Sequence, residues 1–595
     1  MIADVVFDLP LRQAFSYAAP DARALARGQR VWAPLRGKPR LGVVIALRRG
    51  DGVGLEPLGE AVEPVPIASE TALGLCRWAA EESLSSLGST LASLLPPPPR
   101  RRGEAVAPPP MARAATPRLP EIWVGARRRE ELVALLSEMP GSALIIAPDI
   151  AGAGRWARRL QAARLDSGTS DEMRRAAWFA AARGRARAVV GTRSALLAPL
   201  PPPAMLVLLD EQDVAHRPPG APRIHSRDLL RERAALEGSR LVMLSGAPSC
   251  ESWWGSAQGA IACHGADRGP WPEVVTADTR GILRNHPLTP PLTRAIEDAT
   301  RAGRRVALIA ARSATALGCD DCGAVVRCPD CAIALSHARG AAKAICRLCS
   351  RGEPVPDSCA RCGGHRLSPF GWSAERVEAA VARRFPRLRV ARAAPRAPGA
   401  AAPEPDVVIG TAALLRTVRP RSLGSVGFIS LDGLLRLPDF RAGERVFQTL
   451  WTAAEAVGPR GRLVVQTLHP DHHAVAAVRE QDRSAFYGPE IASRRDLGYP
   501  PFRRLCAMTV RGRDRLAAHA LAQECAAAAR GVPGLTVYPP VAAGGPGARR
   551  PRWQVVVKGP AELPRLLAEP LRSVLERGRR AAGVVEVEMD PVSLS

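Results

Sequence analysis

The sequence predicts a multidomain α/β protein with two successive parallel-sheet units, a small β-rich domain before them and an α+β domain after them. Three observations support this prediction. In two successive stretches, short apolar strands alternate with amphipathic helices, which is the pattern of parallel α/β units. Eight cysteines in four C-x-x-C pairs interrupt the second stretch after its first strand. The 595 residues suffice for several domains, each with its own core.

The first domain is predicted to span residues 1–95. Its strand-like runs, broken by glycine and proline, are 5–9, 30–34 and 41–47. A helical pattern follows from Leu73 to Leu95. Residues 96–119 are rich in proline and arginine, a composition typical of a semi-extended linker.

The two α/β units are predicted at 120–280 and at 281–318 continued by 363–470. Their strands are 143–147, 188–190, 205–210 and 241–245 in the first unit, and 305–310, 407–410, 427–431 and 463–467 in the second. The cysteine-rich segment 319–362 separates the first strand of the second unit from the rest, so we interpret it as an inserted module. Residues 471–595 are predicted to form the final α+β domain.

The four cysteine pairs predict two structural zinc sites. The pairs are Cys319/Cys322, Cys328/Cys331, Cys346/Cys349 and Cys359/Cys362. Two cysteines three residues apart can place both thiolates on one tetrahedral ion, and four thiolates complete a structural Zn²⁺ site. Eight thiolates therefore predict two Zn²⁺ ions per chain. The spacing leaves open which pairs share an ion.

Other interpretations of the cysteines have less support. A disulfide cluster needs an oxidising compartment, and the N-terminus shows no secretory signal. A redox C-x-x-C motif usually occurs once rather than four times in tandem. We expect the remaining five cysteines to be small buried apolar residues. They are Cys76, Cys250, Cys263, Cys506 and Cys525.

The net charge of +26 is spread along the whole chain. A long basic protein with no apolar run that could span a bilayer points first to a polyanionic partner, most often nucleic acid, and to no membrane. The alternative is a solvated basic surface without a specific partner. Lysine occurs only at Lys38, Lys343 and Lys558, so most of the positive charge is arginine, which forks onto phosphate oxygens and stacks on bases. The arginine bias, with heavy alanine and proline usage, also indicates a GC-rich genome.

Sequence blocks at strand ends resemble those of two-lobed helicase motors. Leu209-Asp-Glu-Gln-Asp follows a strand and resembles a Walker B motif, with Asp210 and Glu211 as its acidic pair. Blocks that resemble other helicase motifs begin at Gly191, Ser245, Val408, Pro438 and Val465. With the cysteine spacing inserted in the second lobe, the chain resembles the primosomal protein N′ (PriA) family of replication restart proteins over nearly its whole length. It is similar to helicase-motif-deficient copies in GC-rich actinobacteria.

The family resemblance implies two RecA-like helicase lobes with a zinc-binding insertion in the second, and DNA contacts in the terminal domains. Leu11-Arg-Gln-Ala-Phe-Ser-Tyr resembles the start of a DNA 3′-end-binding domain, so Phe15 and Tyr17 are candidates to stack on a terminal base. A core aromatic is the alternative for Phe15. The family's acidic residue after this phenylalanine is Ser16 here, which puts polar recognition of the 3′ hydroxyl in doubt. Arg552 and Trp553 are the DNA-contact candidates of the C-terminal domain.

The resemblance also implies how the eight cysteines divide between the two ions. In the nested arrangement of the family, the outer pairs share one ion and the inner pairs share the other. The outer ligands are Cys319, Cys322, Cys359 and Cys362, and the inner ligands are Cys328, Cys331, Cys346 and Cys349.

This copy departs from the family at the nucleotide site. A P-loop needs G-x-x-x-x-G-K-[S/T], and the chain has one Gly-Lys pair, Gly37-Lys38, followed by proline. At the expected position stands Val124-Gly-Ala-Arg-Arg-Arg-Glu-Glu. In the second lobe, Ala456 and Pro459 stand where the family has two arginines that face the γ-phosphate. Because one such lysine or arginine is worth several orders of magnitude in hydrolysis, we expect neither ATP binding nor catalytic residues, and Asp210 and Glu211 become a remnant.

A further departure concerns the domain that follows the first one. The family places a winged-helix domain there, and here the short Pro-rich linker occupies its place. We therefore expect this domain to be absent.

These observations favour a replication restart protein that binds stalled or abandoned forks and promotes primosome assembly and reloading of the replicative helicase, without helicase activity of its own. Its expected partners are forked or branched DNA, other primosome proteins and the helicase-loading machinery, and its expected place is the cytoplasm, at the nucleoid. Two alternatives remain. One is a residual ATP-dependent 3′–5′ DNA helicase that uses an unrecognised nucleotide site. The other is a zinc-ribbon adaptor that binds protein or RNA.

Overall fold

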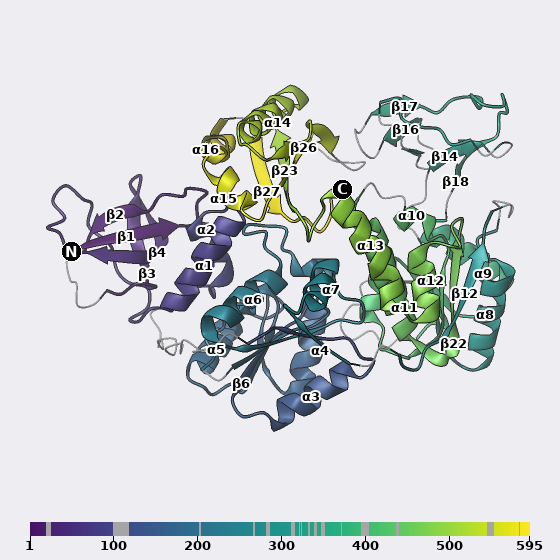
Figure 1. Ribbon diagram of the computed structural model, residues 1–595, viewed down its shortest axis with the longest axis horizontal. Helices are drawn as coiled ribbons and strands as arrows, with labels where there is room; N and C mark the ends of the chain where they lie inside the picture. The colour runs from purple at the N-terminus through teal and green to yellow at the C-terminus, as the bar shows by residue number, and fades with distance from the viewer. Residues whose placement is uncertain are drawn as a thin grey trace.

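The structure is a computed structural model with two parallel-sheet lobes at its centre (Figure 1). It describes residues 1–19, 25–98, 118–201, 204–265, 268–280, 286–310, 316–319, 322, 324–330, 334–337, 342–346, 351–370, 372–393, 404–435, 439–543, 552–581 and 583–594. Most of the predicted linker 96–119 lies outside these residues. Within the described part of the chain, no helix combines the length and the apolar character needed to cross a bilayer. The predicted multidomain α/β fold class is confirmed.

The N-terminal domain is an antiparallel sheet backed by two helices. In sheet order its strands are β2 (Phe15–Ala18), β1 (Ile2–Phe7), β4 (Lys38–Arg48) and β3 (Arg30–Leu35). The predicted helical stretch 73–95 is divided into α1 (Glu70–Glu82) and α2 (Leu87–Leu94). Leu84 turns the chain with φ +51°, and the Ser86 hydroxyl caps α2 by accepting from the Ser89 N–H. Serine side chains favour such caps over helix interiors, which is why the chain breaks here.

Lobe 1 is a fully parallel sheet with helices on both faces. In sheet order its strands are β11 (Ala262–His264), β5 (Glu121–Trp123), β10 (Arg240–Leu244), β9 (Ala204–Leu208), β6 (Ser142–Ile146), β8 (Ala188–Gly191) and β7 (Ala163–Leu165). Its helices are α3 (Arg128–Glu138), α4 (Ile150–Leu160), α5 (Asp171–Ala182), α6 (Ser226–Glu237) and α7 (Cys250–Ala257). The central strands β6 and β9 are buried along their whole length, as their continuous apolar sequence predicts.

Lobe 2 repeats this architecture. In sheet order its strands are β12 (Glu273–Asp278), β22 (Val457–Thr467), β21 (Leu423–Phe428), β13 (Val306–Ile309), β20 (Val407–Gly410) and β19 (Val390–Arg392), all parallel. Its helices are α8 (Pro290–Arg301), α9 (Ala374–Arg384), α10 (Asp432–Leu435), α11 (Ala442–Ala456), α12 (His473–Glu480) and α13 (Arg483–Leu497).

The structure shifts two of the predicted domain boundaries. β12 pairs with β22 of lobe 2, although the prediction placed it in the first unit ending at 280. Lobe 2 also extends past residue 470, because α12 and α13 complete its core. Phe486 of α13, for example, stacks on Phe447 of α11 with ring centroids 4.1 Å apart. The predicted boundaries were set from changes in composition. The buried apolar core of lobe 2, by contrast, begins before residue 280 and continues past residue 470.

The cysteine-rich module is a small antiparallel sheet that lies above lobe 2 in Figure 1. In sheet order its strands are β17 (Gly352–Pro354), β16 (Lys343–Cys346), β15 (Leu335–Ser336), β14 (Ala316–Cys319) and β18 (Leu367–Phe370). β14 leads the chain into the module, β18 leads it out, and the two pair with each other. The module is therefore wider than the predicted span 319–362.

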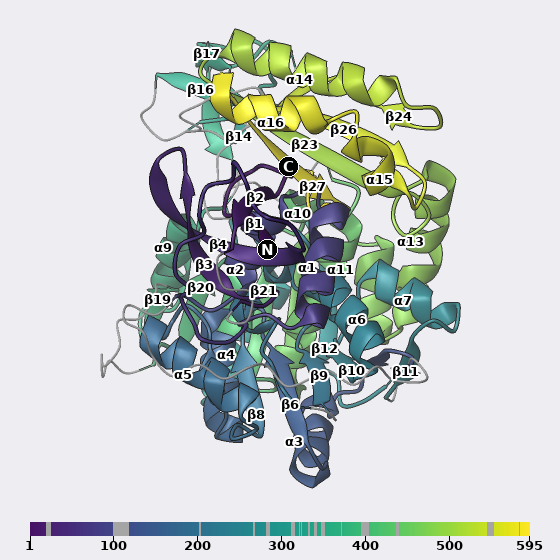
Figure 2. The same ribbon diagram turned by 90° about the vertical axis from the view of Figure 1, so that its left-hand side faces the viewer.

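The C-terminal domain has an α+β architecture and caps the molecule when the N-terminal domain faces the viewer (Figure 2). Its strands are β23 (Arg504–Gly512), β24 (Thr536–Val537), β25 (Val541–Ala543), β26 (Arg552–Gly559) and β27 (Gly583–Met589), and its helices are α14 (Arg515–Arg530), α15 (Leu563–Ala568) and α16 (Arg572–Ala581). The residues after β27 contact both lobes. Arg217 of lobe 1 donates to the Asp590 carbonyl at 2.7 Å, and Arg441 of lobe 2 donates to the Pro591 carbonyl at 3.1 Å.

Candidate functional site

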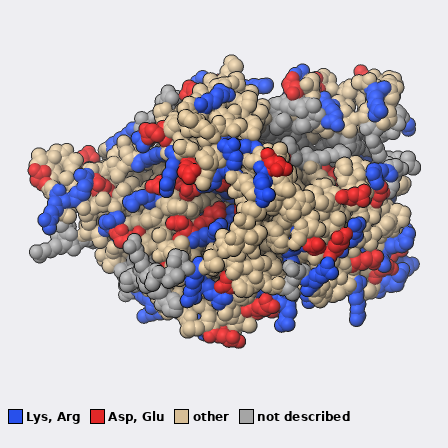
Figure 3. Space-filling model, viewed as in Figure 1, with Lys and Arg blue, Asp and Glu red and all other residues tan. Residues whose placement is uncertain are grey.

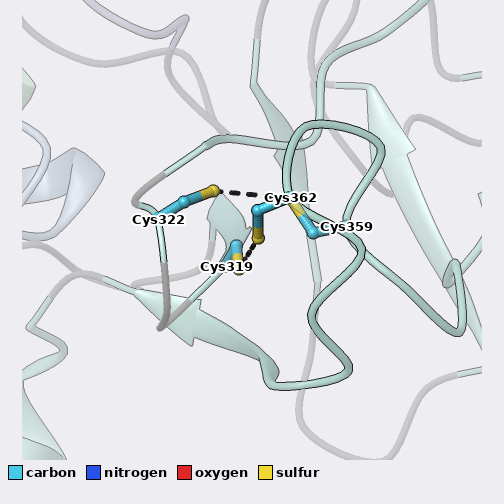
Figure 4. Close-up of side chains that lie close together, drawn as sticks. All are labelled: Cys319, Cys322, Cys359 and Cys362. Atoms are coloured by element: carbon cyan, nitrogen blue, oxygen red, sulfur yellow. Dashed lines mark hydrogen bonds between the residues drawn. The ribbon is translucent and has the colours of Figure 1, made fainter.

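Four of the predicted zinc ligands meet in one cluster. Two come from β14 and the turn after it, and two come from the loop before β18 (Figure 4). They are Cys319, Cys322, Cys359 and Cys362, and their sulfur atoms all lie within 4.8 Å of one another. The Sγ atoms of Cys319 and Cys362 are 3.6 Å apart, as are those of Cys322 and Cys359. A tetrahedral ion with Zn–S bonds of about 2.3 Å places its thiolates about 3.8 Å apart, so this cluster fits a zinc ion.

The backbone around Cys359 folds to support a thiolate. The Cys359 carbonyl accepts from the Gly363 N–H at 2.8 Å, and the turn uses a left-handed glycine with φ +70°. The Arg361 N–H points at the Cys359 sulfur at 3.4 Å. This hydrogen bond helps to lower the pKa of the Cys359 thiol to about 7. The Gly364 N–H favours the Cys362 thiolate, but hydrogen bonds with Cys322 and Cys319 raise the pKa of the Cys362 thiol to about 12.

The structure describes only part of the second predicted zinc site. Cys328 and Cys346 are buried in the core of the module. Their predicted partners Cys331 and Cys349 lie outside the described residues.

One of the five scattered cysteines does not behave as expected. Four of them are buried, namely Cys76, Cys250, Cys506 and Cys525. Cys263 is exposed, so its predicted burial was wrong. It lies on β11, the edge strand of the lobe 1 sheet among the described residues.

Asp210, the first acidic residue of the predicted Walker B remnant, is bound by an arginine of the same lobe. It follows β9 with a left-handed backbone, φ +50°. Arg129 of α3 donates to its carboxylate at 2.8 Å. Burial alone would raise the pKa of Asp210, but the nearby guanidinium groups of Arg129 and Arg128 hold this pKa below its ordinary value. The carboxylate is therefore charged and internally neutralised.

Glu211, the second residue of the pair, is fully buried and serves lobe 1 as a hydrogen-bond centre. Its carboxylate accepts from Arg227 at 2.9 Å, from the hydroxyl and N–H of Ser249 at 2.6 and 3.0 Å, and from the Ser252 hydroxyl at 2.7 Å. These contacts join the end of β9 to α6 and to the start of α7. Sequence reasoning identified Glu211 as a motif residue but not this local network.

The segment predicted to stand at the P-loop position carries two arginines that pair with carboxylates, one in each lobe. β5 ends at Trp123, a turn follows, and α3 begins at Arg128. Arg128 reaches across to Glu455 of lobe 2 with two hydrogen bonds of 2.8 and 2.7 Å. Glu455 was missed by sequence reasoning, although it directly precedes Ala456, one of the two positions where the family has an arginine.

The structure separates the two aromatic candidates of the N-terminal domain. Tyr17 is 3% exposed, and its hydroxyl donates to the Pro34 carbonyl at 2.7 Å, so it is a core residue. Phe15 is half-buried against Phe7, with ring centroids 5.7 Å apart. Ser16 lies opposite Asp4 in the β1–β2 register and donates to its carboxylate at 2.7 Å. A carboxylate therefore lies beside Ser16 after all, supplied by the neighbouring strand.

The C-terminal candidates Arg552 and Trp553 lie on β26 and are half-buried. The Trp553 ring lies against His519 of α14, with centroids 4.2 Å apart, and it also packs against the domain core. The structure thus brings Trp553 together with His519 and leaves part of both candidates accessible.

On the face shown in Figure 3, positive charge is distributed rather than gathered in one patch. Figure 3 shows Lys and Arg side chains along the whole length of the visible face, with Asp and Glu side chains between them. This arrangement agrees with the even spread of arginine along the sequence.

The terminal domains match known family models. Residues 4–96 match the model described as 3'DNA-binding domain (3'BD), and residues 495–592 match the model described as Primosomal protein N C-terminal domain. The first match ends near the predicted boundary at 95. The second begins within α13.

Curated relatives align with most or all of the chain. The replication restart protein PriA of Treponema pallidum (strain Nichols) is 27% identical over 667 aligned residues, which cover 99% of each chain. The replication restart protein PriA of Bacillus subtilis (strain 168) is 27% identical, and the alignment covers 76% of this chain and 59% of that protein. Among solved structures, RecG bound to a three-way DNA junction aligns with a TM-score of 0.35 and 11% identity, over 64% of this chain and 44% of that one.

Proposed function

This chain belongs to the PriA family of replication restart proteins, and we propose that it binds stalled or abandoned replication forks and promotes reloading of the replicative helicase without a motor of its own. The observation that carries the second half of this proposal is the state of the nucleotide site. Arg129 neutralises Asp210, and Arg128 binds Glu455, so the charged groups that would face a nucleotide and Mg²⁺ already have partners. Phosphoryl transfer depends almost entirely on such groups being free to hold phosphates and metal.

We expect the purified protein to bind forked DNA and to show neither DNA-stimulated ATP hydrolysis nor unwinding. Asp210→Ala should therefore leave DNA affinity unchanged. Like the unmodified protein, the variant should show neither ATP hydrolysis nor unwinding. The measurement is an ATPase and unwinding assay on a labelled fork, run beside fluorescence anisotropy on the same fork. ATP hydrolysis that Asp210→Ala removes would show that the lobes are a working motor and would favour the residual helicase.

The N-terminal domain is the proposed DNA end-binding part. Because Tyr17 is buried, another aromatic side chain must supply stacking, and Trp32 on β3 is 45% exposed. The adjacent β3–β4 hairpin turns at Arg36 and Gly37, with φ +54° and +72° as in a tight type I′ turn. Its exposed cations are Arg36, Lys38 and Arg40. A ring that can stack on a base beside cations that can bind phosphates is the usual composition of a single-strand binding surface.

Asp4 is the proposed polar contact of this domain. Its carboxylate is held by Arg48 at 2.8 Å and by the Ser16 hydroxyl at 2.7 Å. Arg48 keeps the pKa of Asp4 below its ordinary value, so the carboxylate is charged and can accept from a sugar hydroxyl. In this way Asp4 would take the role that the resemblance assigns to an acid at position 16.

We expect Trp32→Ala to weaken binding of single-stranded and 3′-tailed DNA by about tenfold, because one base–aromatic stack contributes about 1–3 kcal/mol. Met173→Ala is the matched control, since Met173 is 58% exposed but lies on α5 of lobe 1. Anisotropy titrations at fixed salt measure both variants. Equal affinities of Trp32→Ala and the unmodified protein would remove Trp32 from the interface.

We propose that the cysteine module holds two zinc ions and recruits the other primosome proteins. The four-cysteine cluster supports the first ion, and the second rests on the sequence pairing of Cys328, Cys331, Cys346 and Cys349. A metal-ordered sheet projecting from lobe 2 offers a rigid surface for protein contacts. A protein that works on replication forks acts in the cytoplasm, at the nucleoid.

A further inference from the structure

The two lobes meet through a buried ion pair at the amino end of α3. Arg128, the first residue of this helix, donates from both terminal nitrogens to the two carboxylate oxygens of Glu455, at 2.8 and 2.7 Å. The side chains are 6% and 20% exposed. A bidentate pair is more directional than a single ion contact, and removing one partner of a buried pair is costly because it leaves the other charge without a partner.

The surroundings of Glu455 are shaped to receive its carboxylate. Trp451, one turn earlier on α11, donates its ring N–H to Glu455 Oε1 at 3.3 Å. On the lobe 1 side, Gly246 approaches so closely that a Cβ atom there would lie 2.5 Å from Oε1. A glycine at this position therefore leaves the space that the carboxylate occupies.

A second arginine crosses the same boundary in the opposite direction. Arg483 begins α13 of lobe 2, and it donates to the carbonyls of Gly246 and Val124 in lobe 1 at 2.8 and 2.9 Å. Its guanidinium group lies over the Trp451 ring, 4.3 Å from the centroid. The Tyr487 hydroxyl also donates to the Pro248 carbonyl. Arg128 of lobe 1 thus donates hydrogen bonds to lobe 2, and Arg483 and Tyr487 of lobe 2 donate hydrogen bonds to lobe 1.

These contacts lie at the amino end of α3, a position where a bound anion such as a nucleotide would otherwise connect the two lobes. The amino end of a helix after a parallel strand attracts negative charge, and in nucleotide-driven lobes that charge arrives with the nucleotide. Here a carboxylate of the chain itself is present at this end. Because it is tethered, its effective concentration stays high and it does not leave.

We propose that Glu455 is a built-in ligand that keeps the two lobes permanently closed, in the place that an exchangeable anion would occupy. The lobes then form one rigid platform that holds the N-terminal and C-terminal domains at fixed positions. The inference shares its basis with the proposed absence of a motor and goes beyond the proposed DNA binding, so DNA binding and lobe closure can fail separately.

Hydrogen exchange of the full-length protein, followed by mass spectrometry, tests this closure. The reporting peptides cover 124–132 and 244–251, which face lobe 2, and the reference peptide covers the buried strand β9. Glu455→Gln should raise exchange in both reporting peptides by at least about tenfold and leave β9 unchanged, since local opening governs exchange. ATP with Mg²⁺ should change exchange in neither protein.

A mutant cycle makes the result specific to the pair. Arg128→Gln should match Glu455→Gln, and Arg128→Gln/Glu455→Gln should open the lobes no further than either single change, because all three remove the same contact. The double variant leaves no unpaired buried charge, so it provides a folded readout even if a single variant does not fold. Arg127→Gln on the exposed start of α3 and Glu480→Gln on exposed α12 are the controls.

Two results would overturn the inference. One is a double variant whose reporting peptides stay as protected as those of the unmodified protein. The other is protection of these peptides that increases when ATP and Mg²⁺ are added, because lobes that are already closed gain nothing from a nucleotide. Fork binding is measured on the same samples by anisotropy, so loss of the proposed function is recognised separately.

Discussion

Replacing Cys319 with serine is expected to remove one zinc ion per chain and to unfold the sheet of the cysteine module. The four sulfurs of this cluster lie within 4.8 Å of one another, and a serine hydroxyl cannot replace a thiolate on the ion. Structural zinc in small modules contributes roughly 10–16 kcal/mol of apparent binding free energy, and this energy is also the folding energy of the module. Zinc content by elemental analysis and protease cleavage within 316–370 measure the two effects.

Cys263→Ser is the matched control for this experiment. Cys263 is exposed and lies on lobe 1, outside the cluster, so this variant should keep its full zinc content and its protease resistance. Chelation of the unmodified protein should reproduce the cleavage seen with Cys319→Ser. An unmodified protein that contains no zinc, or a Cys319→Ser variant with full zinc content, would contradict the metal assignment.

Glu444→Gln is expected to destabilise a second buried contact between the lobes. Glu444 of α11 is 3% exposed, and its carboxylate accepts from the Cys250 N–H of lobe 1 at 2.8 Å. It also binds Arg494 at 2.8 Å and Arg441 at 3.0 Å. Losing the charge leaves two buried guanidinium groups short of a partner, at a cost of about 3–5 kcal/mol. A fall of roughly 10 °C in the melting temperature of the lobes should follow.

Differential scanning calorimetry of Glu444→Gln beside Glu480→Gln measures this effect. Glu480 is exposed on α12, so its substitution should leave the melting temperature unchanged. Burial alone would raise the pKa of Glu444, but Arg494 and Arg441 hold this pKa below the ordinary value of 4.5. Its stabilising effect is therefore complete above pH 4.5 and is lost as pH falls through the lower folded value. The difference between the two variants should shrink in that range, and equal melting at neutral pH would contradict the assignment.

A cysteine cluster that could hold a metal ion was predictable from sequence because the determinants of each pair are local. A C-x-x-C pair forms one turn, and the turn alone sets both thiolates toward one ion. The strand assignments of both lobes are local in the same sense, since buried parallel strands are short continuous apolar runs. The absence of a Walker A motif was equally certain from sequence, because three lysines can be inspected one by one.

The candidate DNA site was less predictable because exposure depends on partners distant in sequence. Phe15 and Tyr17 belong to one motif, yet Tyr17 is buried by its contact with Pro34 on β3. Ser16 suggested the loss of an acidic contact, and the β1–β2 register supplies one from Asp4. Trp32 carried no motif that would have distinguished it from a core residue.

The sequence by itself determined that this chain has two parallel α/β lobes, a four-pair cysteine module inside the second, and no Walker A motif. These features are fixed by residues that lie close together along the chain. Only the tertiary structure decided how the two lobes contact each other. Arg128 and Glu455 are 327 residues apart, and neither belongs to a recognisable motif. Their contact exists because two separately folded lobes place α3 and the end of α11 against each other, and no local sequence pattern specifies that placement.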